Sequence, residues 1–313
     1  MGAFTDSVDS AALTVLDPPD YIFLCGGPLA DLEHSLRAQF YERKAKSDPD
    51  LLKRIQLAED ADRWYRSHKV FDDLLELEEL LAGLSACILL FVESPGAIAE
   101  FGAFSQMALL REKLIVVVER SHYDRPSFIR NGPIEQMLRV RPDDLLSYRW
   151  LSAPVGADAG IIDVATLNDT LDDIVRAVQT TLSGKPRTSG FMRENQGHLM
   201  LLIADLVKLN VVSLQGEILE ILNGLKVPVE KSLAKYLFLL GQLGFISEER
   251  YGRNVYYVSP AGAPDHIRYA PRTPLLATDR SRLRSLLRLD FPPNEQKTRA
   301  LDAFNRRIAG ATP

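Results

Sequence analysis

Cysteine is scarce in this chain of 313 residues, which contains only Cys25 and Cys87. Both stand in apolar runs that indicate buried strands, so we expect reduced core thiols rather than a disulfide or a metal pair. No run approaches the roughly 18 apolar residues that a membrane helix needs. The N-terminus is polar and acidic, unlike a secretory signal. These absences predict a soluble cytoplasmic protein with no membrane partner.

The signatures of several enzyme classes are also missing. No Walker A, GxSxG or GxGxxG motif occurs, which disfavours an ATPase, a serine hydrolase and ordinary dinucleotide-dependent redox chemistry. The histidines are scattered without the spacing of metal ligands, at His34, His68, His122, His198 and His266. The sequence therefore predicts neither a metal nor another cofactor.

Charge is distributed unevenly along the chain. The net charge is −5, yet the residues from Lys185 onward carry +7 and those before carry −12. The C-terminal part is therefore the candidate for contact with a polyanion. The charge alone does not decide this, since many basic surfaces bind nothing.

The first part of the chain has the pattern of an α/β domain. Residues 1–20 are polar and predict a loose lead-in. Within 21–184, short apolar runs at 21–25, 86–92 and 114–119 predict buried strands. Helices are expected between them at about 31–46, 50–66 and 70–84 and from Pro95, loops over 121–163, and a helix over 166–182. Continuous apolar strands alternating with helices favour a Rossmann-like parallel sheet covered on both faces.

The second part predicts a smaller module after a linker at 184–190. Three helices (197–209, 214–225 and 228–243) precede a hairpin with a charged, glycine-containing tip at 248–254. This is the layout of a winged helix-turn-helix over 190–262, followed by a basic tail over 263–313. Four cationic residues are candidates for contact with nucleic acid, with protein docking equally open: Lys231, Lys235, Arg250 and Arg253.

The carboxyl ends of parallel strands are where ligands bind in such folds. The first strand runs into Gly26-Gly27-Pro28, and the second into a segment that begins at Glu93. Ser94 is a good N-cap and Pro95 a good first helical residue, so a helix should begin there. We expect free amides near Gly26, Gly27 and Gly96, and at Ala97, to hold sugar or phosphate oxygens.

Glu100 is the candidate catalytic residue. It lies in the second turn of that helix, and small neighbours clear space around its carboxylate. A carboxylate beside a sugar can attack or stabilise the oxocarbenium-like carbon left when an N-glycosidic bond breaks. A solvated helix residue, with small neighbours that permit close packing, fits the same spacing.

Two further carboxylates stand at apolar faces of predicted helices. Glu78 shares a face with leucines of the 70–84 helix, and Asp62 has a comparable place in the preceding helix. A carboxylate in an apolar stripe is costly unless it is paired or borders a cavity. Either could orient a ribose hydroxyl or tune Glu100. For each, the alternatives are an ion pair with an arginine and a position at the edge of the apolar face, in contact with water.

Three segments together resemble the nucleoside 2-deoxyribosyltransferase-like effectors encoded beside bacterial retron reverse transcriptases. These are Tyr21–Gly27, the Leu77-Glu78 helix that leads into an apolar strand, and the run Glu93-Ser94-Pro95-Gly96-Ala97-Ile98-Ala99-Glu100-Phe101-Gly102-Ala103-Phe104. The resemblance covers roughly residues 20 to 260, and the last run is its most specific part.

The resemblance implies a deoxyribosyltransferase-like fold with a C-terminal winged helix and Glu100 as nucleophile. It implies a sugar site formed by the preceding loop, Ser94, Pro95 and Gly96, together with Gly26, Gly27, Pro28 and Glu78. The expected activity is that of an antiviral toxin that cleaves the base-ribose bond of NAD or a related nucleotide. The expected partners are a reverse transcriptase and its multicopy single-stranded DNA, which hold the toxin inactive in a higher-order assembly.

One departure from that family bears on the reaction. The transferases commonly carry Asp-Gly-Thr near the site, where this chain has Glu93-Ser94-Pro95-Gly96. Hydrolysis by water is therefore expected rather than transfer to an acceptor base. Two alternatives stay open, namely a nucleoside deoxyribosyltransferase, and a nucleotide-sensing winged-helix regulator that binds duplex DNA without turnover.

Overall fold

The computed structural model describes residues 2–152, 160–229, 231–273 and 279–310. The chain divides into two compact units. One contains residues 19–185, and the other combines residues 1–18 with residues 186–313. We call them the α/β unit and the second unit.

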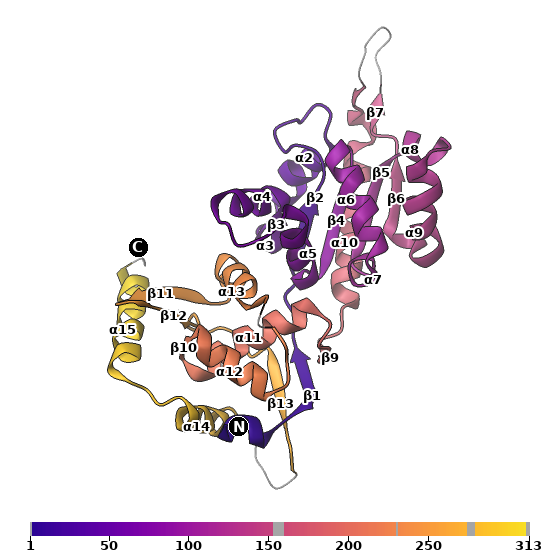
Figure 1. The fold of residues 1–313 in the computed structure, drawn as a ribbon. Coiled ribbons are helices and arrows are strands. Elements are labelled where there is room, and N and C mark those ends of the chain that lie inside the picture. The colour runs from indigo at the N-terminus through magenta and orange to yellow at the C-terminus, as the bar shows by residue number, and fades with distance from the viewer. Residues whose placement is uncertain (1, 153–159, 230, 274–278, 311–313) are drawn as a thin grey trace. The chain divides into compact units, whose positions relative to one another are not determined.

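A five-stranded sheet forms the centre of the α/β unit (Figure 1). Its order is β3-β2-β4-β5-β6, and every neighbouring pair is parallel. This confirms the α/β class and a parallel sheet. The strands are β2 (Ile22–Cys25), β3 (Ile55–Leu57), β4 (Cys87–Val92), β5 (Leu114–Glu119) and β6 (Leu145–Tyr148).

Helices connect these strands. The main ones are α2 (Leu36–Phe40), which continues as a π-turn over Tyr41–Ala45, α3 (Pro49–Arg54), α4 (Ala58–Ser67), α5 (Leu74–Leu84), α6 (Pro95–Gln106), α7 (Ala108–Arg111) and α10 (Val164–Gly184). Shorter elements fill the region after β5: α8 (Arg120–Asp124), η2 (Arg130–Ile134), α9 (Glu135–Val140), η3 (Pro142–Asp144), β7 (Leu151–Ser152) and β8 (Ile161–Ile162).

Two strands of this sheet differ from the sequence-based expectation. The helix predicted over 50–66 is broken by β3, a three-residue edge strand between α3 and α4. The loops predicted over 121–163 include β6. Both are short edge strands with only partial burial, so neither carries the continuous apolar run that marks β2, β4 and β5.

The two faces of the sheet are covered by different helices. Leu24 and Leu89 pack in one core cluster with Ile174 of α10. Since side chains alternate along a strand, the neighbouring Cys25 points to the opposite face. Figure 1 shows α5 and α6 on that opposite face, so the candidate carboxylates are carried by helices on the same side as Cys25.

Two antiparallel sheets build the second unit. The first has the order β13-β1-β9, with β1 (Val8–Leu16), β9 (Thr188–Gly190) and β13 (Ile267–Pro271). The predicted loose lead-in over residues 1–20 is therefore wrong. Residues 8–16 pair on both sides with strands far along the chain, and Val8 and Val15 are fully buried.

The second sheet has the order β10-β12-β11. Its strands are β10 (Val212–Leu214), β11 (Ser247–Tyr251) and β12 (Asn254–Val258). The predicted hairpin is present, because Tyr251 pairs with Asn254 across a turn in which Gly252 has a φ of 63°. That left-handed conformation favours glycine.

The helices of the second unit are α1 (Ala3–Ser7), α11 (Gln196–Asn210), α12 (Gln215–Gly224), α13 (Leu233–Gln242), α14 (Arg280–Asp290) and α15 (Glu295–Gly310). The predicted basic tail is thus folded into β13, α14 and α15. Among the residues that the structure describes, no helix is both long and apolar enough to cross a membrane.

A buried carboxylate joins the last elements to α11. Asp205 is fully buried and accepts hydrogen bonds from the Tyr269 hydroxyl at 2.8 Å and from two guanidinium nitrogens of Arg280 at 2.6 Å each. Its Oδ1 also accepts from the His266 and Ile267 amides at 2.8 and 3.2 Å. This network fixes β13 and α14 to α11.

Candidate active site

The candidate site begins at the carboxyl ends of β2 and β4. These strands are parallel neighbours in which Cys25 pairs with Leu90. Their following loops, Gly26-Gly27-Pro28 and residues 93–96, therefore start at one edge of the sheet. This edge is where ligands bind in open α/β folds.

Gly26 cannot be replaced by another residue without strain. Its φ is 143°, and an added Cβ would lie 2.8 Å from both the Cβ and the carbonyl oxygen of Phe91. The contact would force backbone or core atoms to move. The predicted tight glycine turn after β2 is thus required by close packing against β4.

Gly27 is equally constrained, and its amide is not free. A Cβ would lie 2.8 Å from Oε1 of Glu93, and the Gly27 N–H donates to that same oxygen at 3.3 Å. The expectation that this amide is available to a ligand is therefore wrong, because Glu93 already uses it. Pro28, the next residue, is exposed.

Glu93 connects the β4 edge to the start of α2. Its Oε1 accepts from the Ser35 hydroxyl at 2.6 Å and the Arg37 amide at 3.2 Å, and its Oε2 accepts from the Leu36 amide at 2.9 Å. Burial raises the pKa of Glu93, while these hydrogen bonds oppose the rise. The sequence pattern alone assigns Glu93 no role. The available signal was a carboxylate placed directly after a buried strand.

Arg37 is a buried cation beneath the loop after β2. Only 1% of it is exposed, and its Nη1 and Nη2 donate to the carbonyls of Gly27 and Leu24 at 2.8 Å each. The same nitrogens form a bidentate ion pair with Glu59 of α4, at 2.6 and 2.7 Å. Nothing in the sequence pattern pointed to Arg37, because an arginine in a helix usually projects into water.

Helix α6 begins as predicted from the sequence. Ser94 is the N-cap, and its hydroxyl accepts from the Ala97 amide at 3.1 Å, with Pro95 in the first turn. The Ala97 amide is therefore occupied rather than free, which corrects that part of the expectation. Pro95 and Gly96 are exposed, so this turn is open to solvent.

Glu100 is partly buried on α6. Its Oε2 atom is inaccessible to solvent and has no hydrogen-bond partner among the residues that the structure describes. Burial raises the pKa of Glu100, and the Arg37 charge opposes this rise. A buried acceptor without a partner is expensive for a purely structural residue, so this geometry favours the functional interpretation over that of a solvated helix residue.

Glu78 of α5 is 6% exposed, and its pKa is raised to about 8. Burial is the main cause, and the charges of Glu100 and Asp62 add to it. The pKa of Cys25 is also raised, first by burial and then by Glu100 and Glu78. The charges of Glu78 and Glu100 therefore both act at the end of β2, and the Glu78 carboxyl stays protonated near neutral pH.

Asp62 has a simpler role. It is 41% exposed on the side chain and forms an ion pair with Arg66 one turn later, at 2.8 Å. The alternative of an arginine partner is therefore the one observed. Within the described ranges, no group of three or more histidine, cysteine, aspartate or glutamate residues could hold a metal ion.

The four cationic candidates lie in the second unit. Lys231 is exposed just before α13, and Lys235 is partly buried within that helix. Arg250 of β11 forms an exposed ion pair with Glu248 at 3.2 Å, and Arg253 is exposed in the hairpin turn. These side chains therefore belong to a different unit from the carboxylate cluster.

Residues 33–248 match the STM3845 retron effector protein family. This span covers α2, both candidate carboxylates and the β10–α13 region. The chain belongs to this retron effector family.

Two relatives from Escherichia coli support the assignment. The chain is 37% identical to the "Retron Ec86 putative ribosyltransferase/DNA-binding protein" over 126 residues, which is 40% of this chain and 39% of that protein. It is 26% identical to the "Retron Ec73 putative ribosyltransferase/DNA-binding protein" over 246 residues, 72% of this chain and 74% of the relative.

Proposed function

We propose that this retron effector is an N-glycosidase that hydrolyses the base-ribose bond of NAD or of a related nucleotide. The observation that carries the proposal is the pair formed by Glu100 and Glu78 at the carboxyl edge of the parallel sheet. The Glu100 carboxyl has a buried oxygen that accepts no hydrogen bond from the described residues, and the Glu78 carboxyl has a pKa of about 8. Family membership and the relatives' ribosyltransferase names support it.

In this mechanism the ionised Glu100 carboxylate faces the anomeric carbon of the ribose. The bond from that carbon to the base nitrogen breaks, and its electron pair leaves with the base. Glu100 either bonds to the carbon or stabilises its positive charge, and water then completes hydrolysis. Nicotinamide needs no proton to leave, because its ring nitrogen is cationic while it is attached.

Glu78 positions the ribose. A protonated carboxyl can donate one hydrogen bond and accept another, which suits it to a ribose hydroxyl. Its neutrality also avoids a second negative charge beside Glu100. The exposed turn at Ser94, Pro95 and Gly96 is our choice for the remaining sugar contacts.

The test is base release by wild type and by Glu100→Gln, with Glu79→Gln as the matched control. Glu79 is the neighbour of Glu78 in α5 and is not part of the proposed site. Each protein is incubated with NAD and with a panel of nucleosides and nucleotides, and released bases are separated by chromatography. Release by wild type and Glu79→Gln but not by Glu100→Gln supports the proposal. Equal release by all three would contradict it.

A second base added to the same assay separates hydrolysis from transfer. The relatives' names keep a deoxyribosyltransferase as an alternative. If base exchange exceeds the formation of free ribose products, the transferase is the correct assignment. Hydrolysis without exchange supports the N-glycosidase.

We further propose that a retron reverse transcriptase and its multicopy single-stranded DNA hold this activity inactive within a higher-order assembly. Family membership supports an association with retron components. Adding both components should suppress base release by the full chain. Unchanged release in a complex verified by size-exclusion chromatography would rule out inhibition.

A winged-helix regulator is the second candidate function. The element order α11-β10-α12-α13-β11-β12 supports this candidate, as does the "DNA-binding" in the names of both relatives. This candidate predicts tight, salt-dependent and sequence-dependent binding of duplex DNA through Lys231, Lys235, Arg250 and Arg253. The full chain should be used, because β1 supplies a strand to the second unit. Binding that ignores sequence counts against it.

A further inference from the structure

The second unit has a cavity away from α13 and the β11–β12 hairpin. It holds about 150 Å³, at the place where α11 gives way to β10 beside α14 and α15. Its lining is mixed polar and apolar: Asn210, Val211, Val212, Arg288, Phe291, Pro293, Lys297, Thr298 and Leu301. None of these residues has been used in the proposed function.

One cation at this cavity is available to a ligand. Arg288 is exposed on α14, and its side chain makes no hydrogen bond or ion pair with the described part of the chain. Arg284, one turn earlier, is also exposed, and its side chain makes no ion pair with the described residues. By contrast, Arg280 is committed to Asp205, and Lys297 pairs with Glu217 at 2.7 Å. The uncompensated charge is therefore at Arg284 and Arg288.

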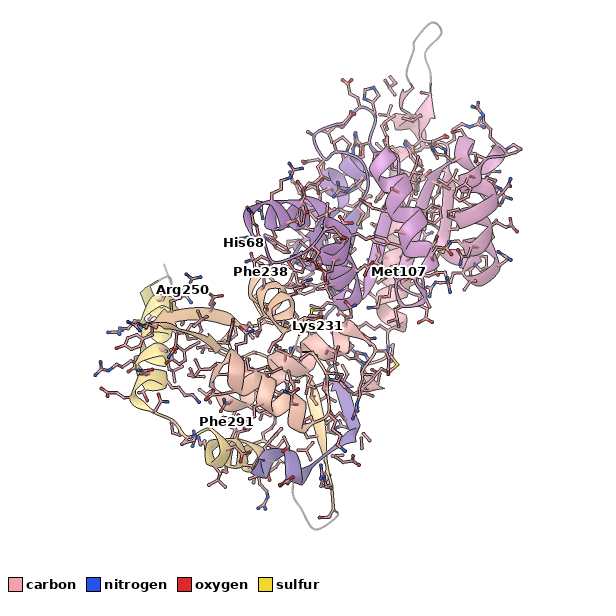
Figure 2. The ribbon with its side chains drawn as sticks, in the orientation of Figure 1. His68, Met107, Lys231, Phe238, Arg250 and Phe291 are labelled. Carbon is pink, nitrogen blue, oxygen red and sulfur yellow. The ribbon has the colours of Figure 1, made fainter. Side chains whose placement is uncertain are left out.

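The wall of the cavity offers a ring and a hydrogen-bond acceptor. Phe291, at the end of α14 (Figure 2), supplies the aromatic side chain, with Leu301 and Val212 as apolar neighbours. The Asn210 amide nitrogen donates to the Ser213 hydroxyl at 3.0 Å, while its oxygen accepts no hydrogen bond from the described residues. An aromatic surface with one polar acceptor suits the face and edge of a heterocyclic base.

The backbone beside Asn210 is strained. Val211 has a φ of 70° and a ψ of −54°, which is unusual for a β-branched residue. This conformation ends α11 abruptly and places Asn210 and Val212 on either side of the bend, both in the cavity wall. Strain of this kind occurs often at ligand-binding positions.

We propose that this cavity receives one unstacked base of a single-stranded nucleic acid, with the neighbouring phosphates bound by Arg288 and Arg284. A cavity of about 150 Å³ is large enough for a six-membered ring such as benzene, so one base ring fits this space. A base in a duplex stays stacked and paired, and it cannot enter. Stacking on an aromatic residue next to a cationic track is the usual mode of single-strand binding. The inference is independent of the Glu100 chemistry.

The test measures the anisotropy of a labelled oligo(dT) of about 12 nucleotides, within the length that such sites bind, against an abasic strand of equal length. The wild-type full chain should prefer oligo(dT). Phe291→Ala should weaken oligo(dT) binding by roughly 5- to 100-fold and abolish the preference over the abasic strand. Arg288→Ala should lower the slope of log K against log salt by about 0.7.

Two controls keep the outcome decisive. Arg282→Ala removes the same charge from an exposed position on α14 that does not line the cavity, so the preference for oligo(dT) should persist. Phe291→Trp keeps the ring and should keep the preference, which separates lost stacking from misfolding. Equal wild-type affinity for both strands, or an unaffected Phe291→Ala, would each overturn the proposal. Glu100→Gln should bind oligo(dT) normally, so failure of the catalytic proposal is recognised separately.

Discussion

Arg37 and Glu59 form a bidentate ion pair under the candidate site, with Nη1 2.6 Å from Oε1 and Nη2 2.7 Å from Oε2. The arginine is buried, whereas the carboxylate side chain is 49% exposed. The pair therefore holds a cation inside the protein while its partner remains partly hydrated. The fixed positive charge also lowers the pKa of Glu100 against the effect of burial.

Replacing Arg37 by Met should destabilise the α/β unit by about 2–4 kcal/mol. The change leaves the Leu24 and Gly27 carbonyls without their donors and Glu59 without its partner. Urea unfolding of the full chain measures the loss. Arg63→Met is the matched control, because Arg63 is exposed and, within the described part of the chain, pairs with Asp60 alone, one turn away. It should change stability by less than about 0.5 kcal/mol. Equal effects of the two substitutions would contradict a special role for Arg37.

Glu93→Gln should destabilise the protein by about 1–3 kcal/mol, because an NH2 group replaces one carboxylate oxygen and cannot accept hydrogen bonds from the start of α2. Glu100→Gln should cost little or increase stability, since its buried oxygen has no hydrogen-bond partner to lose among the residues that the structure describes. Thermal unfolding of the two variants compares carboxylates seven residues apart. A larger loss of stability in Glu100→Gln than in Glu93→Gln would contradict a structural role for Glu93 and a catalytic role for Glu100.

The elements around the site could be predicted because their signals are local. The buried strands β2, β4 and β5 are uninterrupted apolar runs, and the Ser94 cap with Pro95 marks the start of α6 in the sequence itself. Glu78 stood out as a carboxylate on a leucine-rich helical face, and the structure buries it.

What could not be predicted depends on contacts between distant residues. Glu93 reaches Ser35 across 58 positions, and Arg37 reaches Glu59 across 22, so no local pattern encodes either interaction. The N-terminal strand β1 joins a sheet with β13, more than 250 residues later. Its sequence does not alternate strictly between polar and apolar residues, so no local pattern marks it as a strand before those partners are known.

Gly26→Ala should destabilise the protein by at least about 2 kcal/mol, through the positive φ and the contact with the Phe91 backbone. Gly102→Ala is the matched control on α6, where nothing lies within 4 Å of the added Cβ. It should stabilise the helix by up to about 1 kcal/mol. Chemical denaturation compares the two directly. A tolerated Gly26→Ala would mean that the turn after β2 can relax.

The raised pKa of Glu78 makes stability depend on pH. The folded protein holds this proton up to about pH 8, whereas the unfolded chain releases it near the ordinary value of 4.5. Between these values the folded state binds more protons, so stability falls as pH rises and levels off above about 8.

Glu78→Gln cannot ionise and should flatten this decline, with a gain on the order of a few kcal/mol at pH 8. Unfolding by urea at several pH values between about 5 and 9 measures both slopes, and Glu33→Gln, at an exposed position, serves as the control. Parallel curves for wild type and Glu78→Gln would show that Glu78 ionises at its ordinary pKa, and the protonated partner of Glu100 in the proposed mechanism would then be lost.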